Sequence, residues 1–470
     1  MNYVQNTDAD RKAMLAQVGA ASIDELMSVI PTDCRFDGPL EVEPALSEDE
    51  LLRHMRQLAE RNVSADDHPS FLGAGAYHHF CPALVDSLVS RTEFWTAYTP
   101  YQPEASQGTL RTILEWQTMM CRLTGLDVSN ASLYDGATAV VEAAMMALRL
   151  KPKADRVIVS RGVHPDARGC LATYMRSLGI ELVEVDLGDG TTPTAGLTAA
   201  LDQGTPACAI IQSPNFWGCI EDVAAAAEAA HAADALCIVS ADPVSLSLLK
   251  PPGEQGADLV CGEATGMGNP PWFGGPGVGY LCAKMEFVRQ MPARIAGETT
   301  DAQGRRAVVL TFQTREQHIR RTKATSNICT SQQLMALRAT LWMTLLGKQG
   351  FVELGRTNLS RATYAYDRLC ALDGWGPAFP GAAFFNEFTL RSPLPAAEVN
   401  RRLLADHGII GGFEGQRVAE CSGSPADRSG AAGTSAGATL ADDHLLVLAV
   451  TDMNTKEQID ALVSALETMR

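Results

Sequence analysis

Short apolar runs rich in β-branched residues recur between residues 154 and 283, and their spacing constrains the fold more than any other feature of the sequence. The runs are separated by roughly 20 to 28 residues, and several intervals are Ala-rich, as in Val223–Ala235. Strands that alternate with helices form βαβ units, so we predict an α/β fold with a mostly parallel sheet covered on both faces. The predicted strands contain Val157–Val159, Leu182–Val185, Ala209–Ile211, Cys237–Val239, Leu259–Val260 and Val278–Leu281.

The chain has 470 residues, which is more than one average domain. We predict an N-terminal helical arm over residues 1–60, a large α/β domain over 61–330 and a small α+β domain over 331–470. The elements expected in the small domain are helices at Leu334–Leu346 and Asn358–Leu372 and strands near 384–390 and 445–450. Residues 421–441 are rich in Gly, Ser, Ala and Pro and have little to bury, which predicts a flexible loop.

The charge balance is acidic, with 38 Lys and Arg against 55 Asp and Glu and a net charge of −17. Nucleic-acid binding needs a basic surface and an anionic membrane repels an acidic chain, so we expect no nucleic-acid partner and no membrane partner. The densest local group of basic residues is Arg315, Arg320, Arg321 and Lys323.

The sequence also bears on compartment and metal binding. No apolar run approaches the ~18 residues that span a bilayer. The polar segment Asn2–Lys12 is unlike a signal peptide, so we expect a cytoplasmic protein with reduced thiols. The 12 cysteines show no CxxC pair and no Cys/His ligand spacing, so we expect no metal site.

Ligands of such sheets bind beside the carboxyl ends of the strands, which directs attention to three places. Gly136, Ala137 and Thr138 lie where a loop meets a predicted helix, and the free N–H groups of a helix start favour a phosphate, although small residues there also serve packing. Asp242 follows a predicted strand and could hold a protonated pyridinium nitrogen or simply cap a turn. His164 could stack on a ring, transfer a proton or lie in a surface loop.

Three loops carry residues suited to contact with a ligand or a partner. The Tyr98 loop (Tyr98–Gly108) combines tyrosines and polar groups with prolines that stiffen it, although Ser106 could simply cap the next helix. Phe71–His79 is rich in glycine. Arg315–Thr330 begins with a charged segment, for which a solvated helix face is the default interpretation, and its end fits neither a helix nor an amphipathic strand.

Together these segments resemble the P-protein of the glycine cleavage system, and the resemblance covers nearly the whole chain. The motifs that carry it are Phe71–His78, Tyr98–Gly108, Asn130–Leu133, Gly274–Gly277 and Arg315–Thr330. The resemblance implies a fold-type I architecture for pyridoxal 5′-phosphate (PLP). It also implies a reaction in which glycine loses its carboxylate as CO2 while PLP serves as the electron sink. The aminomethyl group then passes to the lipoyl group of H-protein.

In part of this family two homologous halves are separate subunits, and this chain is similar to the N-terminal half. The resemblance therefore implies a second subunit as partner, in an α2β2 assembly. One departure concerns the lysine that must hold PLP. No lysine lies between Lys250 and Lys284, and counting back from Gly275-Pro276-Gly277 places the missing lysine near Thr265. Subunit 2 would then hold PLP covalently, and the vestigial cofactor site in this chain would comprise Gly136, Ala137, Thr138, His164, Asp242 and Thr265.

We therefore hypothesise that Tyr98, Tyr101 and Gln102 position the glycine carboxylate in the partner's active site or shield the carbanion from water. Glu104 would position a donor or transfer a proton, and the loop Phe71–Tyr77 would reach across as well. Two alternatives stay open. One is an independent PLP decarboxylase or lyase with an unusual lysine, and the other is a non-catalytic scaffold that stabilises subunit 2 or docks H-protein.

Overall fold

The computed structural model describes residues 6–36, 38–272, 274–418 and 442–469. By their contacts they form two units, Met1–Val63 and Ser64–Arg470. The helical elements of the first unit are α1 (Asp8–Val18), α2 (Ile23–Leu26), 3-10 turns at Met27–Val29 and Thr32–Cys34, and α3 (Glu48–Ala59). Capping boxes begin α1 and α3. Apart from Ala20, no described side chain of this unit is buried, so the unit has almost no core of its own.

The second unit is built on a seven-stranded sheet with the order β1-β7-β6-β5-β4-β2-β3. The strands are β1 (Val128–Ser129), β2 (Arg156–Ser160), β3 (Glu181–Val185), β4 (Pro206–Gln212), β5 (Leu236–Ser240), β6 (Leu259–Glu263) and β7 (Gly279–Ala283). The five strands from β3 to β6 in this order are parallel, whereas β7 pairs antiparallel with β6 and with β1. All six strands predicted from the apolar runs are present, and the predicted mostly parallel α/β fold is confirmed.

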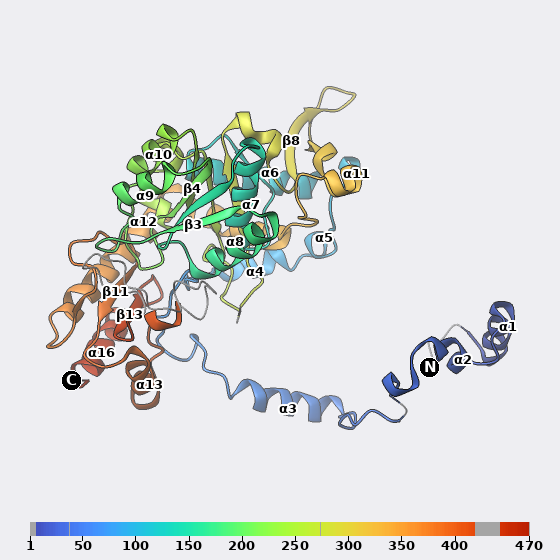
Figure 1. Cartoon of the computed structure of the whole chain (residues 1–470). Helices are drawn as coiled ribbons and strands as arrows, with labels where there is room; N and C mark the ends of the chain where they lie inside the picture. The colour runs from blue at the N-terminus through green and yellow to red at the C-terminus, as the bar shows by residue number, and fades with distance from the viewer. Residues whose placement is uncertain (1–5, 37, 273, 419–441, 470) are drawn as a thin grey trace. The chain divides into compact units, whose positions relative to one another are not determined.

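Helices cover both faces of this sheet (Figure 1). They include α6 (Gln107–Thr124), α7 (Gly136–Leu150), α8 (Pro165–Leu178), α9 (Thr194–Leu201) and α10 (Val223–Ala232). Successive side chains of a strand point to opposite faces. In β4, Cys208 and Ile210 therefore pack in the core with α7 and α8, whereas Ala209 and Ile211 pack in the core with α6, α9 and α10. Burial on both faces explains why these strands are continuous apolar runs in the sequence.

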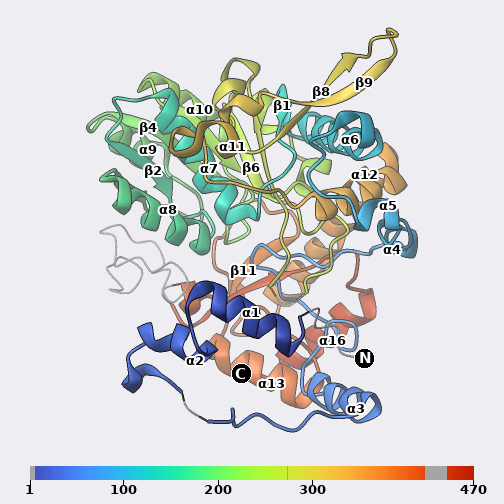
Figure 2. The ribbon, with the colours of Figure 1, turned by 90° about the vertical axis from the view of Figure 1, so that its right-hand side faces the viewer.

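Short elements flank the sheet. Those before α6 are α4 (Ala83–Val89), α5 (Thr92–Trp95) and a 3-10 turn at Pro103–Ala105. After the sheet, β8 (Ile295–Thr300) and β9 (Arg306–Thr311) form an antiparallel ribbon that projects from the rest of the unit (Figure 2). The turn Gln313–Arg315, α11 (Gln317–Arg320) and the turn Arg321–Lys323 follow it. Further 3-10 turns lie at Ser245–Ser247, Pro252–Gln255, Met285–Gln290 and Gly415–Arg417.

A second, antiparallel sheet has the order β10-β11-β13-β12. Its elements are β10 (Gly376–Pro377), β11 (Glu387–Arg391), β12 (Phe413–Glu414) and β13 (Leu445–Ala449), with α13 (Ala396–His407) and α16 (Lys456–Glu467). The strands expected near 384–390 and 445–450 are thus confirmed. The two expected helices are joined in α12 (Gln333–Cys370), which is interrupted only at Gly347, with φ 63°. Glycine takes this conformation without a Cβ clash, so a single residue provides the break.

Some expectations are only partly addressed by the structure. The loop predicted at 421–441 lies outside the described residues. None of the described helices is long and apolar enough to cross a membrane. Within the described ranges, no three or more His, Cys, Asp and Glu side chains are placed to hold a metal ion. The division into an arm, a large domain and a small domain stays a prediction.

Candidate functional site

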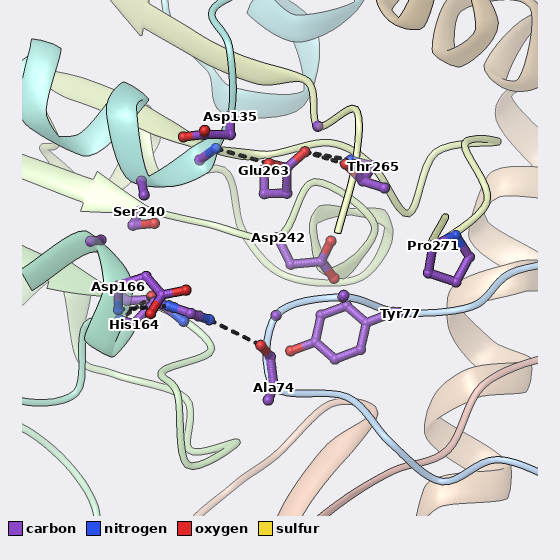
Figure 3. Close-up of a pocket in the computed structure, with 18 of the residues that line it drawn as sticks. Ala74, Tyr77, Asp135, His164, Asp166, Ser240, Asp242, Glu263, Thr265 and Pro271 are labelled. Atoms are coloured by element: carbon purple, nitrogen blue, oxygen red, sulfur yellow. Dashed lines mark hydrogen bonds between the residues drawn. The ribbon is translucent and has the colours of Figure 1, made fainter. Parts of the chain in front are cut away.

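A cavity of about 450 Å³ lies at the carboxyl edge of the large sheet, and we call it the sheet-edge cavity (Figure 3). Loops that follow β2, β4, β5 and β6 line it, together with the start of α7, residues Ala74–Tyr77 and the glycines of 274–277. Five of the six residues of the predicted vestigial site line this cavity: Gly136, Ala137, His164, Asp242 and Thr265. The sixth, Thr138, is not among the lining residues. The structure therefore gathers residues from distant segments of the chain around one space.

The start of α7 is closed by a capping box. The Thr138 N–H donates to Asp135 Oδ1 at 2.7 Å, and the Asp135 N–H donates to Thr138 Oγ1 at 3.3 Å. The Gly136 N–H, at the first helical position, donates instead to Glu263 Oε2 at 2.9 Å. The helix end at which the sequence left a phosphate or a packing role open therefore faces a carboxylate of the chain itself.

Glu263 ends β6, and its other carboxylate oxygen is also fully engaged. Oε1 accepts from the Thr265 N–H at 3.0 Å and from the Val278 N–H at 2.8 Å, and the Thr265 hydroxyl donates to it as well. Sequence analysis assigned no role to Glu263. A carboxylate directly after a buried strand, two residues before the position of the missing lysine, is the signal that could have identified it.

His164 is held by both ring nitrogens. The Asp166 N–H donates to His164 Nδ1 at 3.2 Å, so Nε2 carries the proton that is donated to the Ala74 carbonyl at 3.0 Å. Burial lowers the pKa of His164, which keeps the ring neutral at pH 7. Its ring also meets the Phe216 ring edge-on at 5.1 Å. His164 therefore holds residues 74–75 in place, and neither of its ring nitrogens is available to a ligand.

Asp242 follows β5, and its contacts agree with the turn-capping interpretation, whereas a role toward a pyridinium nitrogen stays a prediction. Its carboxylate accepts from the N–H groups of Val244 at 3.1 Å and Ser245 at 3.2 Å, so it caps the following turn. It also lines the sheet-edge cavity, between Glu263 and Tyr77 (Figure 3). Burial raises the pKa of Asp242 above its usual value.

The loop Phe71–Tyr77 is fastened to this chain by Glu387, on β11. The Ala74 N–H donates to Glu387 Oε1 at 2.6 Å, and the Tyr77 hydroxyl donates to Oε2 at 2.7 Å. Burial raises the pKa of Glu387 to about 7, and burial followed by the nearby Glu387 charge raises that of Tyr77. Ala74–Tyr77 thus form a wall of this chain's own cavity, and a role in a partner's site stays a prediction. Sequence analysis missed Glu387 because it lies in a distant strand.

The two lysines nearest in sequence both lie at the opposite edge of the sheet. Lys250 precedes the turn that leads into the amino end of β6. Lys284 follows β7, whose antiparallel register sets Ala283 opposite Leu259, and its ammonium contacts the Asp258 carboxylate. Thr265 follows the carboxyl end of β6, and a strand of five residues spans about 16 Å. Neither lysine is placed at the Thr265 end.

The residues of the sheet-edge cavity do not fit PLP. PLP brings an anionic phosphate and needs a lysine for covalent attachment. The described residues that line this cavity include neither lysine nor arginine, but they include the carboxylates of Asp135, Asp166, Asp242 and Glu263. Because Glu263 already accepts the Gly136 N–H, the helix end offers a phosphate no free donor at that position. No chemical step is therefore assigned to PLP within this cavity.

The Tyr98 loop lies apart from these residues and is largely exposed. Tyr98 is 74% exposed, and Gln102 and Glu104 are also exposed. Tyr98 and Thr99 line a second cavity of about 210 Å³ together with Arg294 and Thr330. Contrary to the capping interpretation, Ser106 makes no side-chain hydrogen bond at the start of α6.

Tyr101 is the anchored member of the Tyr98 loop. Its hydroxyl accepts from Arg294 Nη2 at 3.0 Å, and the Arg294 guanidinium lies 5.4 Å from the centre of its ring. The His318 ring meets it edge-on at 5.6 Å. Because Tyr101 accepts this bond, its own O–H remains a possible donor.

The predicted basic cluster needs one correction. Arg315 is buried, and its guanidinium donates to the carbonyls of Met291 and Ala293, so it is not part of an exposed basic surface. Burial lowers the pKa of Arg315 to about 10. The irregular segment that follows is held by tertiary contacts, since the Thr325 N–H donates to the Arg315 carbonyl at 2.9 Å and the Cys329 N–H donates to the Tyr134 hydroxyl at 3.0 Å.

Comparison with known proteins identifies similar sequences over nearly all of the chain. The profile of the family described as "Glycine cleavage system P-protein" matches residues 1–409. A Brevibacillus brevis protein named "Probable glycine dehydrogenase (decarboxylating) subunit 1" is 47% identical over 469 residues, which cover 99% of this chain and 98% of that protein. A Bacillus cytotoxicus protein with the same name is 46% identical over 462 residues, with 98% of each chain covered.

Solved structures give the same grouping. One described as glycine decarboxylase (P-protein) of the glycine cleavage system, in inhibitor-bound form, is 39% identical, with a TM-score of 0.83 over the whole of both chains. A Burkholderia pseudomallei sphingosine-1-phosphate lyase is 14% identical, with a TM-score of 0.63 over 92% of each chain, and this likeness shows the fold alone. The chain has the fold of fold-type I PLP-dependent enzymes.

Proposed function

The chain belongs to the glycine cleavage system P-protein family, and on that basis we propose that it is the subunit that does not hold PLP covalently. With subunit 2, in an α2β2 assembly, it decarboxylates glycine and transfers the aminomethyl group to the lipoyl group of H-protein. The name "subunit 1" carried by its relatives implies such a second subunit. A cytoplasmic location, expected from the sequence, is part of the same proposal.

The single observation that carries the proposal is the position of the lysines. Lys250 and Lys284 lie at the amino end of β6, whereas the place for a PLP lysine is at its carboxyl end, beside Thr265. The P-protein reaction depends on PLP, which supplies the electron sink when bound. A chain that cannot attach PLP at its own sheet edge must therefore work with a chain that can.

The contribution we assign to this chain is made by the Tyr98 loop. Tyr98 is exposed and free to contact a partner, and Tyr101 is oriented by Arg294. In the partner's active site, the hydroxyls of Tyr98 and Tyr101 and the Gln102 amide bind the glycine carboxylate and exclude water from the reacting carbon. Glu104 orients a donor or moves a proton at its carboxylate.

The test is to purify the full chain with and without subunit 2 and to assay both preparations with PLP. Alone, the chain is expected to show no visible absorption from lysine-bound PLP and no glycine-dependent CO2 exchange. Addition of subunit 2 should give both signals. Borohydride that fixes PLP on a lysine of this chain would instead support the alternative of an independent PLP enzyme.

The scaffold alternative makes a different prediction for the Tyr98 loop. A scaffold that only stabilises subunit 2 loses affinity for its partner when its contact residues change, but the assembled complex keeps its turnover. Under our proposal, Tyr98→Phe and Tyr101→Phe keep the assembly and lose exchange. Sedimentation of each variant complex, combined with the exchange assay, separates the two.

A further inference from the structure

The Glu263 carboxylate accepts hydrogen bonds from donors in separate segments of the chain, as a bound anion would. It accepts from the N–H groups of Gly136, Thr265 and Val278 and from the Thr265 hydroxyl. These donors come from the start of α7, the loop after β6 and the residue before β7. Figure 3 shows the Glu263 carboxylate between the start of α7 and Thr265.

The backbone around Glu263 is fitted closely to its side chain. A Cβ atom added at Gly136 would lie 2.8 Å from the Glu263 Cβ, and one added at Gly277 would lie 2.9 Å from Oε2. Both distances are shorter than real Cβ contacts, so these two positions require glycine. The small residues at the start of α7 suggested space for a phosphate, but the carboxylate of Glu263 fills that space.

The charges of the cavity act in the same direction. The positive end of the α7 dipole and the Gly136 N–H, which has no partner within the helix, favour one anion, and Glu263 supplies it. A phosphate in the same place would face Glu263 and Asp135 at close range, without an arginine or lysine among the described lining residues. Like charges at such distances repel strongly, and the Gly136 donor is already engaged.

We propose that Glu263 is a permanent internal anion that takes the place of a phosphate group at the start of α7 and excludes phosphorylated ligands, including PLP bound without a covalent bond. This goes beyond the proposed function, which requires only that this chain lacks the PLP lysine. It also holds whether or not the Tyr98 loop enters a partner's active site.

The test uses the full chain and inorganic phosphate as the probe. Melting temperatures of the wild type, Glu263→Ala and Glu263→Ser are measured in phosphate and in chloride buffers of equal ionic strength. Both variants are expected to melt lower than the wild type in chloride. Phosphate at about a hundred times its Kd should then raise their melting temperature by roughly 2–4 °C, because it fills the vacated anion position. The wild type should not respond beyond the general effect of the salt.

Glu387→Ala is the matched control. It removes a buried carboxylate that accepts one N–H and one hydroxyl bond, but on a strand and not at a helix start. It should melt lower than the wild type without any phosphate-specific gain. Glu263→Ser keeps a hydroxyl near the same N–H groups, so the test stands even if Glu263→Ala does not fold.

A second readout uses pyridoxamine 5′-phosphate, which cannot react with lysines, in calorimetric titrations of the full chain without subunit 2. The wild type should show no binding, and Glu263→Ala or Glu263→Ser should show one site. The proposal is overturned if the wild type binds either probe as well as the variants do, or if the variants gain no more from phosphate than Glu387→Ala. Failure of exchange with subunit 2 would instead count against the proposed function and would leave these results unchanged.

Discussion

The sheet-edge cavity and the Tyr98 loop differ in where their polar groups are directed. Glu263 and His164 of the cavity, and Glu387 that holds its Ala74–Tyr77 wall, are bound by other groups of the same chain. In the Tyr98 loop, Tyr98, Gln102 and Glu104 are exposed, and Tyr101 contacts Arg294 and His318 while remaining partly exposed. The first region is satisfied from within, whereas the second presents groups that a partner can use.

Under our proposal, this difference explains how a chain can keep the fold of a PLP enzyme while a partner holds the cofactor. The sheet forms the core of the unit, and Asp242 caps the turn after β5, so both have structural roles that need no cofactor. The carboxylate of Glu263 keeps the start of α7 satisfied without phosphate. Under our proposal, the residues that act on the substrate are therefore the exposed ones of the Tyr98 loop.

The largest expected effect contrasts a glycine from each region. Gly136→Ala places a Cβ 2.8 Å from the Glu263 Cβ and 3.0 Å from its backbone nitrogen, which cannot move easily. We expect a loss of about 3 kcal/mol in the free energy of unfolding, at the upper end of over-packing costs. Gly108→Ala, in the first turn of α6, meets nothing within 4 Å and should be neutral or stabilising by about 0.4–1 kcal/mol. Urea denaturation of both variants measures the two changes in the free energy of unfolding, and equal changes would contradict the difference expected between the two regions.

The next effect concerns activity in the Tyr98 loop. Tyr98→Phe or Tyr101→Phe removes one hydroxyl, and a hydrogen bond to a charged substrate group is worth about 1.5–3 kcal/mol. Glycine–CO2 exchange by the complex with subunit 2 should fall about tenfold to a hundredfold, with little change in assembly. Unfolding should change little in Tyr98→Phe, whereas Tyr101→Phe also removes the acceptor of Arg294 and should lower the free energy of unfolding by about 1 kcal/mol. Tyr174→Phe, a partly exposed tyrosine on α8, is the matched control and should retain full exchange. Unchanged exchange in both loop variants would remove this role from the Tyr98 loop.

Local patterns in the sequence were sufficient to predict the sheet. The strands β2 and β4 to β7 are buried on both faces, and this burial produces the apolar runs from which they were predicted, whereas β3, at the edge of the sheet, is only partly buried. The joining of both helices into α12 was not predicted, because Gly347, Gly350 and Gly355 lie between Leu346 and Asn358 and glycine has a low helix propensity. In the structure Phe351 and Gly355 are buried, so tertiary packing keeps this segment helical although its intrinsic propensity is low.

The candidate site could be predicted only in part, for a related reason. Strand ends and helix starts have local signals, so Gly136, His164 and Asp242 were found and lie around one cavity. The partners of these residues come from distant segments. Glu263 lies 127 residues from Gly136, and Glu387 lies 313 residues from Ala74. No local pattern indicates which carboxylate meets which N–H group, because tertiary folding alone brings them together.

A smaller effect tests whether the cavity wall is held from within by Glu387. Its pKa in the folded chain is about 7, above the usual 4.5, because the carboxyl is buried. The folded chain therefore keeps a proton that the unfolded chain has lost. The stabilisation is complete below about pH 4.5 and is lost as the pH rises to about 7. Within that window, the wild type should lose about 1 kcal/mol per pH unit relative to Glu387→Gln. Urea denaturation at a series of pH values measures the difference, and parallel curves would contradict a protonated Glu387.

The smallest effect is expected at Glu104, the exposed carboxylate of the Tyr98 loop. An exposed charge interacts through water, so its contribution is limited to about 1 kcal/mol or less and weakens with salt. Glu104→Gln should lower glycine–CO2 exchange by about two- to fivefold at low ionic strength, and the deficit should shrink as salt is added. Glu286→Gln, another exposed carboxylate outside the loop, should leave exchange unchanged. A deficit that persists undiminished at high salt would mean that Glu104 becomes buried against subunit 2. The assembled complex would then make this part of the loop as enclosed as the sheet-edge cavity.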